Sequence, residues 1–381
     1  MEFAWDPDDA AFRAQLQAFL DEVLPEDWER ISADGPGSEA QLRFSRPFCA
    51  ALAERGWLTQ HWPAEYGGRD ASAWRHAILG EEMWACGEPR GSQYMNVNWI
   101  GPAIMRYGSE VQKALHLPRI SAGDVLWCQG FSEPNAGSDL ASLATRAERR
   151  GDDYLVNGQK IWTSYCNEAD YCFLLVRSES GSSGRHGLSV LLMPMTLAGV
   201  EVREIPSIIG HRYFHEVFLR DVQVPADCLL GEENAGWDVV TYALAYERVG
   251  AARYARAART LDVLAGHARA TGRLADPVLQ RKLGAARAAC EAARVLSYRV
   301  IDLRAKQSPP TADTNLARVA ATEADKRVGE LALEVWGGDG VEYDSFAAAN
   351  FRLAMTAGVA VGATEVQLNL IASRWLGLPR A

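Results

Sequence analysis

The sequence predicts an α+β fold: an N-terminal α-helical domain, a middle antiparallel β domain and a C-terminal α-helical bundle. Three observations predict it. Apolar residues recur at helical spacing through the first third of the chain. Short β-prone runs separated by Gly, Asn, Ser and Pro fill the middle, and helical spacing returns after Gly231. We therefore place the domains at 1–126, 127–230 and 231–381.

The first third predicts five helices. Phe12, Leu16 and Phe19 open the first one, within residues 10–30, and Pro25 stops it. The second carries Phe44, Phe48 and Leu52 and ends at Gly56. The others are expected at 72–86, at 101–107, and up to Leu117, where Pro118 would end the last.

The middle predicts strands, and the last third predicts long helices. Residues 154–156 and 159–163 read as a hairpin about an Asn157-Gly158 turn. Further strands are expected at 171–176, 188–193, 200–205 and 216–222. Past these, one helix is expected over 237–264, and others over 277–306, 315–336 and 364–376, with a break at 337–340.

Composition limits the class of protein. The 381 residues suffice for a large core, and 48% hydrophobic with 23% charged residues is ordinary for a globular protein. A net charge of −10 without a basic stretch argues against nucleic acid. The seven cysteines include no C-x-x-C, which predicts reduced thiols of a cytoplasmic protein and no metal site. The alternative is that Cys166 and Cys172 form a disulfide or bind a metal ion. The acidic start lacks a signal sequence, and no apolar run is long enough for a membrane.

The most informative stretch runs from Trp127 to Ser164. Residues 131–139 (Phe-Ser-Glu-Pro-Asn-Ala-Gly-Ser-Asp) form a rigid loop rich in hydroxyl and amide donors. Residues 157–164 follow with Trp162 close to two hydroxyls. Such a loop beside such a strand could hold a flat, hydrogen-bonding ring such as a flavin; ordinary turns are the alternative. No G-x-G-x-x-G follows a strand, so a Rossmann domain would not hold it.

The order and separation of these two motifs resemble the acyl-CoA dehydrogenase family. Its members carry a Thr/Ser-Glu-Pro-x-x-Gly-Ser-Asp loop and then a Gly-x-Lys-x-Trp-x-Thr/Ser strand. The segment 56–68, with Gly-Trp and Pro-x-x-Tyr-Gly-Gly, is also similar to the family. The resemblance implies an FAD-dependent dehydrogenase of acyl thioesters, giving the trans-2-enoyl thioester. It also implies an electron-transfer flavoprotein as partner and a homotetramer or dimer of dimers.

The resemblance also implies the cofactor contacts. The loop and strand would contact the flavin through Phe131, Ser132, Gly137, Ser138, Trp162, Thr163 and Ser164. A second subunit's Gln-x-x-Gly-Gly element would hold the FAD pyrophosphate, and here it reads Glu334, Gly337 and Gly338, with an acid at the Gln position. Arg269 or Arg273 would meet the dinucleotide, with a surface arginine as the alternative. Ala363 and Glu365 match residues on the cofactor side.

The catalytic base departs from the commoner pattern of the family. Many members carry a Glu near the C-terminus where this chain has Val361, which cannot take a proton. A branch of the family instead places the carboxylate on the helix after the β domain, where Glu247 precedes Arg248. That branch implies Glu247 as base, Arg248 as its neighbour, and the Val361 backbone N–H as donor to the thioester oxygen. A surface Glu–Arg pair is the alternative.

Other functions stay open at this point. The chain could be a member of the family that acts as a flavin oxidase or monooxygenase. It could also be a non-catalytic subunit of a hetero-oligomeric dehydrogenase. The sequence does not reveal the acyl group, nor whether CoA or a carrier protein bears it.

Overall fold

A computed structural model describes residues 5–33, 37–250, 252–308, 312–360 and 362–379; the side chains of 33, 210–212 and 246–250 are also outside the description. The chain divides into two compact units, each built from separate stretches. Unit 1 comprises Met1–Asp34, Asp70–Pro89 and Arg248–Ala381. Unit 2 comprises Gly35–Arg69 and Arg90–Glu247. The predicted order of helices, antiparallel-rich sheet and helices is confirmed, while the domain boundaries at 126 and 230 stay a prediction.

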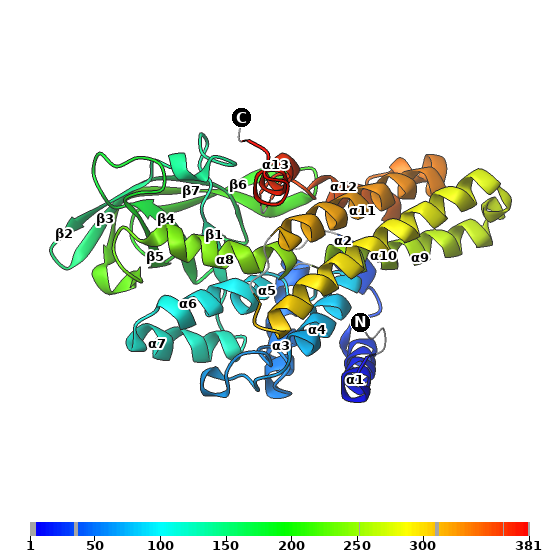
Figure 1. The fold of residues 1–381 in the computed structure, drawn as a ribbon, viewed down its shortest axis with the longest axis horizontal. Helices are drawn as coiled ribbons and strands as arrows, with labels where there is room; N and C mark the ends of the chain where they lie inside the picture. Colours follow the sequence, from blue (N-terminus) through cyan, green and yellow to red (C-terminus); the bar gives the residue numbers. More distant parts are fainter. Residues whose placement is uncertain (1–4, 34–36, 251, 309–311, 361, 380–381) are drawn as a thin grey trace. The chain divides into compact units, whose positions relative to one another are not determined.

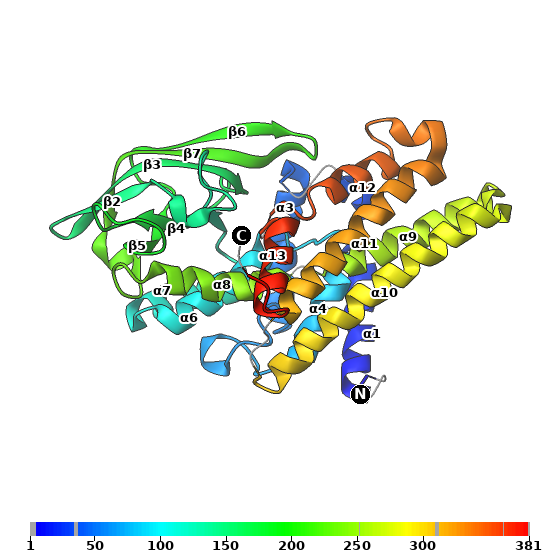
Figure 2. The ribbon, with the colours of Figure 1, turned by 45° about the horizontal axis from the view of Figure 1, so that its top comes forward.

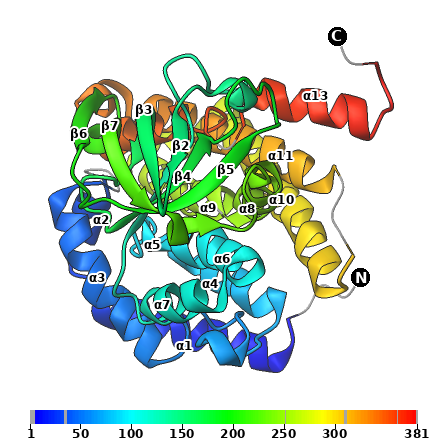
Figure 3. The ribbon, with the colours of Figure 1, turned by 90° about the vertical axis from the view of Figure 1, so that its left-hand side faces the viewer.

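Unit 2 contains an eight-stranded sheet in the order β6-β7-β3-β2-β4-β5-β8, with β1 paired to β4 (Figure 3). The strands are β1 (Trp127–Gly130), β2 (Arg146–Arg150), β3 (Asp153–Ser164), β4 (Tyr171–Arg177), β5 (Leu188–Pro194), β6 (Val200–Ser207), β7 (Gly210–Pro225) and β8 (Leu229–Leu230). Most pairs are antiparallel, but β1 and β2 meet β4 in parallel. The parallel β1 extends the sheet directly into the 131–139 loop.

The helices of unit 2 lie mainly on one side of this sheet. They are α3 (Glu39–Glu54), α5 (Gln93–Met95), α6 (Gly101–Tyr107), α7 (Glu110–Ser121) and α8 (Gly236–Gly250), with a π-turn at Asn96–Ile100. Figure 1 shows α6, α7 and α8 together on that side. A core cluster joins them to the sheet through Trp99, Trp127, Val190 and Ala243, all at most 1% exposed. Burial of this apolar surface supports the strand that leads into the site.

The expected hairpin within 154–163 is wrong. Residues 153–164 form one strand, β3, paired with β2 on one edge and β7 on the other. The turn lies earlier, between Arg150 and Asp153. Gly158 serves close approach and not a turn, since a Cβ there would lie 2.7 Å from the Thr145 Cα. An Asn-Gly pair signals a hairpin only when no neighbouring strand needs that space.

Unit 1 is helical. It contains α1 (Pro7–Val23), α2 (Trp28–Ala33), α4 (Ala73–Ala85), α9 (Arg253–Ala270), α10 (Pro277–Ala305), α11 (Asp313–Trp336), a 3-10 turn η6 (Gly337–Val341), α12 (Phe346–Met355) and α13 (Thr364–Arg374). Figure 2 shows α9, α10 and α11 side by side. Their core is rich in alanine, with Ala257, Ala286 and Ala324 at most 1% exposed. Small side chains let the long helices approach closely.

Three helix predictions need correction. Pro118 does not end its helix, because its carbonyl accepts from the Ala122 N–H and the Ser121 hydroxyl, both at 3.0 Å. The single helix expected over 237–264 is two, α8 and α9, since Ala252 has a non-helical ψ of 56°. The sequence analysis also missed α12, which Ser345 caps by accepting from the Ala348 N–H at 3.0 Å.

Candidate functional site

The 131–139 loop is held in shape by its own glutamate. The Glu133 and Ala136 backbones bond to each other in both directions, at 2.9 and 3.0 Å. The Glu133 carboxylate accepts from the Ala144 N–H at 2.6 Å and the Thr145 N–H at 2.8 Å. These bonds tie the loop to the start of β2. They leave Gly137 and Ser138 exposed and Ser132 half-buried, so predicted donors are accessible.

A buried lysine of β3 also holds this loop. The Lys160 Nζ donates to the Phe131 carbonyl at 3.0 Å and to Glu133 Oε1 at 2.8 Å, and its side chain is fully buried. The Ile161 N–H donates to the Ser132 carbonyl at 2.9 Å. Burial acts to raise the pKa of Glu133, but the Lys160 charge and the donated hydrogen bonds outweigh it and lower the pKa. The carboxylate is therefore ionised.

The end of β3 turns its tryptophan outward. Trp162 has a left-handed φ of 59° and is 55% exposed, and the β3–β7 register shifts between Lys160 and Thr163. A β-bulge of this kind re-aims side chains at the edge of a sheet. A left-handed φ at an aromatic residue costs about 1–3 kcal/mol and is concentrated at functional sites. Within the described residues the Trp162 ring meets the Phe214 ring edge-on, with the ring centroids 5.9 Å apart.

These residues fit a bound flavin. The buried Thr163 Oγ1 has no hydrogen-bond partner within the described residues, and an unpaired buried hydroxyl costs about 1–3 kcal/mol. Beside it stand the half-buried Ser164 and the exposed face of Trp162. An unpaired polar group, a free aromatic face and loop donors are the complement of a ring that is flat and polar at its edges. The structure thus ties the loop that carries four of the predicted cofactor residues to the strand that carries three more.

The predicted pyrophosphate element forms a second cluster, in unit 1. Glu334 pairs with Lys282 at 2.5 Å, so the acid at the Gln position is neutralised. The Arg273 Nη1 donates to the Val335 carbonyl at 2.7 Å. Gly337 has φ 69° and ψ −141°, a conformation essentially restricted to glycine. Arg269 and Gly338 are exposed. The sequence analysis missed Lys282, which lies on another helix and gave no motif signal.

The predicted oxyanion donor, Val361, lies outside the described residues, but its surroundings are defined. Arg318, which is 3% exposed, donates to the Ala360 carbonyl at 3.1 Å. Asn315 donates to the Gln367 side chain at 2.5 Å. Gly358 and Gly362 both have a positive φ, of 79° and 82°. Two buried polar residues of α11 therefore bond the chain on either side of Val361, Arg318 at Ala360 and Asn315 at Gln367 of α13. Sequence motifs did not point to either.

The remaining predicted residues are placed only in part. Ala363 is half-buried before α13, and Glu365 is exposed in its first turn. Glu247 and Arg248 belong to α8, with side chains outside the described residues. The described face of α8 carries Val240 and Ala243 into the core. Whether Glu247 and Arg248 meet the substrate therefore stays a prediction.

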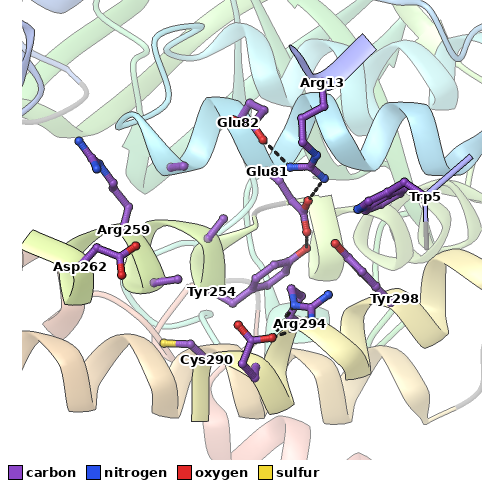
Figure 4. Close-up of a pocket in the computed structure, with 14 residues that line it drawn as sticks. Trp5, Arg13, Glu81, Glu82, Tyr254, Arg259, Asp262, Cys290, Arg294 and Tyr298 are labelled. Carbon is purple, nitrogen blue, oxygen red and sulfur yellow. Dashed lines mark hydrogen bonds and ion pairs between the residues drawn. The ribbon is translucent and has the colours of Figure 1, made fainter. Parts of the chain in front are cut away.

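A cavity of about 340 Å³ lies elsewhere in unit 1, between α1, α4, α9 and α10. Figure 4 shows Arg13 and Tyr254 pointing at Glu81 in it. The Tyr254 hydroxyl donates to Glu81 at 2.8 Å, and Arg13 bonds the same carboxylate at 2.5 Å. The residues that line it include none of the predicted site. The buried Glu81 carboxylate is bonded to Arg13 and Tyr254, so it belongs to a structural ion-pair cluster.

The cysteines and the apolarity of the helices do not change this description of the site. All seven cysteines are free, and five of them are buried. Among the described residues no cluster of His, Cys, Asp and Glu could hold a metal ion. Within the same ranges, none of the helices combines the length and apolarity that a membrane span requires.

Helices flanking an antiparallel-rich sheet, with a donor-rich loop fixed against an outward tryptophan, fit the class of flavoprotein oxidoreductases. Comparison with known proteins then narrows the class. Models of the acyl-CoA dehydrogenase N-terminal, middle and C-terminal domains match residues 6–124, 128–222 and 234–376. The chain is 35% identical to acyl-CoA dehydrogenase IpdE1 of Mycobacterium tuberculosis over 379 residues, covering 97% of each. It therefore belongs to the acyl-CoA dehydrogenase family.

Two solved structures and a further relative are similar to this chain over its whole length. The steroid ACAD Tcur3481-Tcur3483 matches with a TM-score of 0.91 and 31% identity, over 100% of both chains. The ChsE4-ChsE5 complex of Mycobacterium tuberculosis matches with a TM-score of 0.88 and 32% identity, again over 100% of both chains. The FadE26 acyl-CoA dehydrogenase of Mycobacterium tuberculosis is 33% identical over the full length of both.

Proposed function

We propose that this chain catalyses the FAD-dependent α,β-dehydrogenation of an acyl thioester, giving the trans-2-enoyl thioester. The observation that carries the proposal is the loop of residues 131–139 fixed against β3, with Trp162 exposed and Thr163 unpaired. When bound, FAD supplies a hydride acceptor for the substrate Cβ. Removal of the α-proton and support of the developing enolate fall to the protein.

Glu247 is our candidate for the base. It stands four residues after Ala243 and seven after Val240, and α-helical periodicity puts all three positions on one face of α8. The Val361 position carries no proton acceptor, so this chain needs a base from elsewhere. Arg248 would orient or neutralise charge beside it.

The backbone N–H of Val361 is our candidate for the donor to the thioester oxygen. A donor aimed at developing negative charge is worth about 2.7–4 kcal/mol when preorganised. Arg318 bonds the neighbouring Ala360 carbonyl, and the 358–362 loop begins and ends on glycines with positive φ. These contacts would keep the loop, and hence its amide, in place while the substrate changes.

The resemblance assigns the cofactor two sets of contacts, which come from two different subunits. Flavin contacts come from Phe131, Ser132, Gly137, Ser138, Trp162, Thr163 and Ser164. Pyrophosphate contacts would come from Gly337 and Gly338 of a second subunit, with Arg269, Ala363 and Glu365 nearby in the family pattern. Glu334 is compatible with a phosphate because Lys282 neutralises it. The Lys282 ammonium is one more cation for this element.

The relatives suggest a bulky acyl group and a second chain. Two structural neighbours are named for pairs of proteins, Tcur3481-Tcur3483 and ChsE4-ChsE5, and the first is called a steroid ACAD. We propose a steroid-type acyl-CoA as substrate and an electron-transfer flavoprotein as acceptor. An assembly with a related chain is a second candidate, and the Val361 position favours it because one chain of such a pair need not carry every catalytic group.

The test is anaerobic bleaching of the flavin by acyl-CoA esters. A panel would compare straight, branched and ring-bearing acyl groups on the purified protein. Glu247→Gln should bleach about 10²–10⁴ times more slowly, the usual contribution of a general base. Asp238→Asn is the matched control, because it removes an exposed carboxylate from the first turn of the same helix. Bleaching of Glu247→Gln at the wild-type rate would refute the base assignment.

The purified chain alone decides the second candidate. A monodisperse, yellow protein that bleaches with substrate supports a self-sufficient enzyme. A colourless protein that becomes yellow and active only when a related chain is co-expressed supports the paired assembly.

A further inference from the structure

The buried pair of Lys160 and Glu133 has no role in the chemistry derived above. The two side chains are 0% and 8% exposed, and their charged atoms are 2.8 Å apart. Taking two charges out of water costs several kcal/mol for each ion, and replacing such a pair with neutral residues of similar size is often neutral or stabilising. Stability alone therefore gives no reason for an ion pair at this place.

The direction of the hydrogen bonds gives a reason for an ion pair at this place. Lys160 holds the Phe131 carbonyl, one residue before Ser132. Lys160 itself stands two residues before Trp162 on β3. The pair therefore joins the chain segment that presents the loop hydroxyl to the segment that presents the indole.

Glu133 adds a third element. Its two carboxylate oxygens accept from Lys160 and from the Ala144 and Thr145 amides, so β3, the loop and the entry to β2 all meet at one carboxylate. Among the described residues, three hydrogen bonds join 131–139 to 157–164: two from Lys160 and one from the Ile161 N–H to the Ser132 carbonyl. Without the pair a single backbone bond would fix the loop to the strand.

We propose that the Lys160–Glu133 pair is a positioning element of the flavin site, which sets the loop donors against Trp162 before the cofactor arrives. The inference rests on the proposed FAD-dependent function. Because the two halves of the site come from different segments, their separation depends on a rigid cross-link. A positioned site binds its ligand more tightly since it pays less ordering entropy on binding.

The decisive variant is the double substitution Lys160→Met with Glu133→Gln. Gln keeps the length of Glu133 and Met is one atom shorter than Lys160, the buried charges are removed together, and the Gln oxygen can still accept from an amide at 144 or 145. We expect unfolding at a denaturant concentration equal to or above that of the wild type. FAD binding to the apoprotein, followed by flavin absorption, should weaken about 10- to 100-fold, the usual effect of removing supporting partners of a bound group.

Hydrogen exchange gives a readout that needs no cofactor. In the apoprotein of the double variant the Ile161 and Ala136 amides should exchange faster, while the β4–β5 amides keep their rates. Leu191→Ala is the matched control: Leu191 is fully buried on β5, and its removal costs stability without touching the pair. It should leave FAD affinity unchanged.

The outcomes separate the two proposals. A wild-type chain that binds no FAD contradicts the proposed function, and the exchange rates then still test the positioning role. Unchanged exchange at Ile161, or unchanged FAD affinity in the double variant, overturns the inference. So does an equal loss of affinity in Leu191→Ala. If the double variant does not fold, Lys160→Arg replaces it as the test, because arginine keeps the charge but cannot place a single Nζ atom between the two acceptors. An FAD affinity of Lys160→Arg equal to that of the wild type also overturns the inference.

Discussion

Asp325 offers the sharpest stability prediction for unit 1. Its carboxylate is 1% exposed and pairs with Arg253 at 3.1 Å and with Arg256 at a shorter distance. Arg256 is buried, and burial lowers its pKa, although Asp325 acts in the opposite direction. The second acceptor of Arg256 is the Asn350 side chain at 3.0 Å, which carries no charge.

Substitution Asp325→Asn would leave a guanidinium buried without its counter-ion. Breaking a buried pair in this way costs about 3–5 kcal/mol. At about 1.4 kcal/mol per tenfold change, the α9 and α11 amides that open only on unfolding should exchange roughly 100- to 4,000-fold faster. Native-state hydrogen exchange measures this in unit 1 without assuming that the whole chain unfolds in one step.

Two variants test the cause. Glu323→Gln removes an exposed carboxylate from the same helix and should change exchange by about twofold at most. Adding Arg256→Met to Asp325→Asn should recover part of the loss, because the buried charge is then removed. A cost below about 1 kcal/mol for Asp325→Asn would refute the reasoning, since the charge would then be solvated by other means.

Three further predictions concern the site, the pH dependence and the thiols. In a flavin titration, Trp162→Ala should weaken FAD binding roughly 5- to 30-fold, or about 1–2 kcal/mol, and Trp162→Phe should weaken it less. Equal FAD affinities in the wild type and in both variants would contradict the stacking role. Burial lowers the pKa of His116 to about 4, so the unfolded chain takes up a proton at this position at a higher pH than the folded chain. The free energy of unfolding should therefore fall as the pH drops from about 6.5 toward 4. The variant His116→Phe should remove this part of the pH dependence from an acid-unfolding curve. Burial raises the pKa of Cys290 to about 11 and of Cys228 to about 12. A thiol reagent at pH 8 should react with the five buried cysteines only after denaturant is added, and their rapid reaction in native buffer would argue against buried thiols.

Much of the fold and of the candidate site could be predicted from the sequence because the signals are local. Helical spacing predicted α10 and α11 to within about two residues, as expected for element ends. The loop of residues 131–139 and the Trp162 strand were recognisable because both motifs are contiguous. The errors arose where a distant partner overrode a local signal: Gly158 makes room for Thr145, and the α8–α9 break is followed by arginines that Asp325 holds.

What the tertiary structure decided is which residues hold the site together. The sequence by itself determined the family, the cofactor class and the candidate base, since these follow from residue types at fixed spacing. It did not reveal that Lys160 clamps a loop 27 residues earlier, that Lys282 neutralises Glu334 across 52 residues, or that Arg318 holds a carbonyl 42 residues further on. Such contacts depend on how strands and helices pack, and no local pattern encodes the pairing of two residues that only the fold brings into contact.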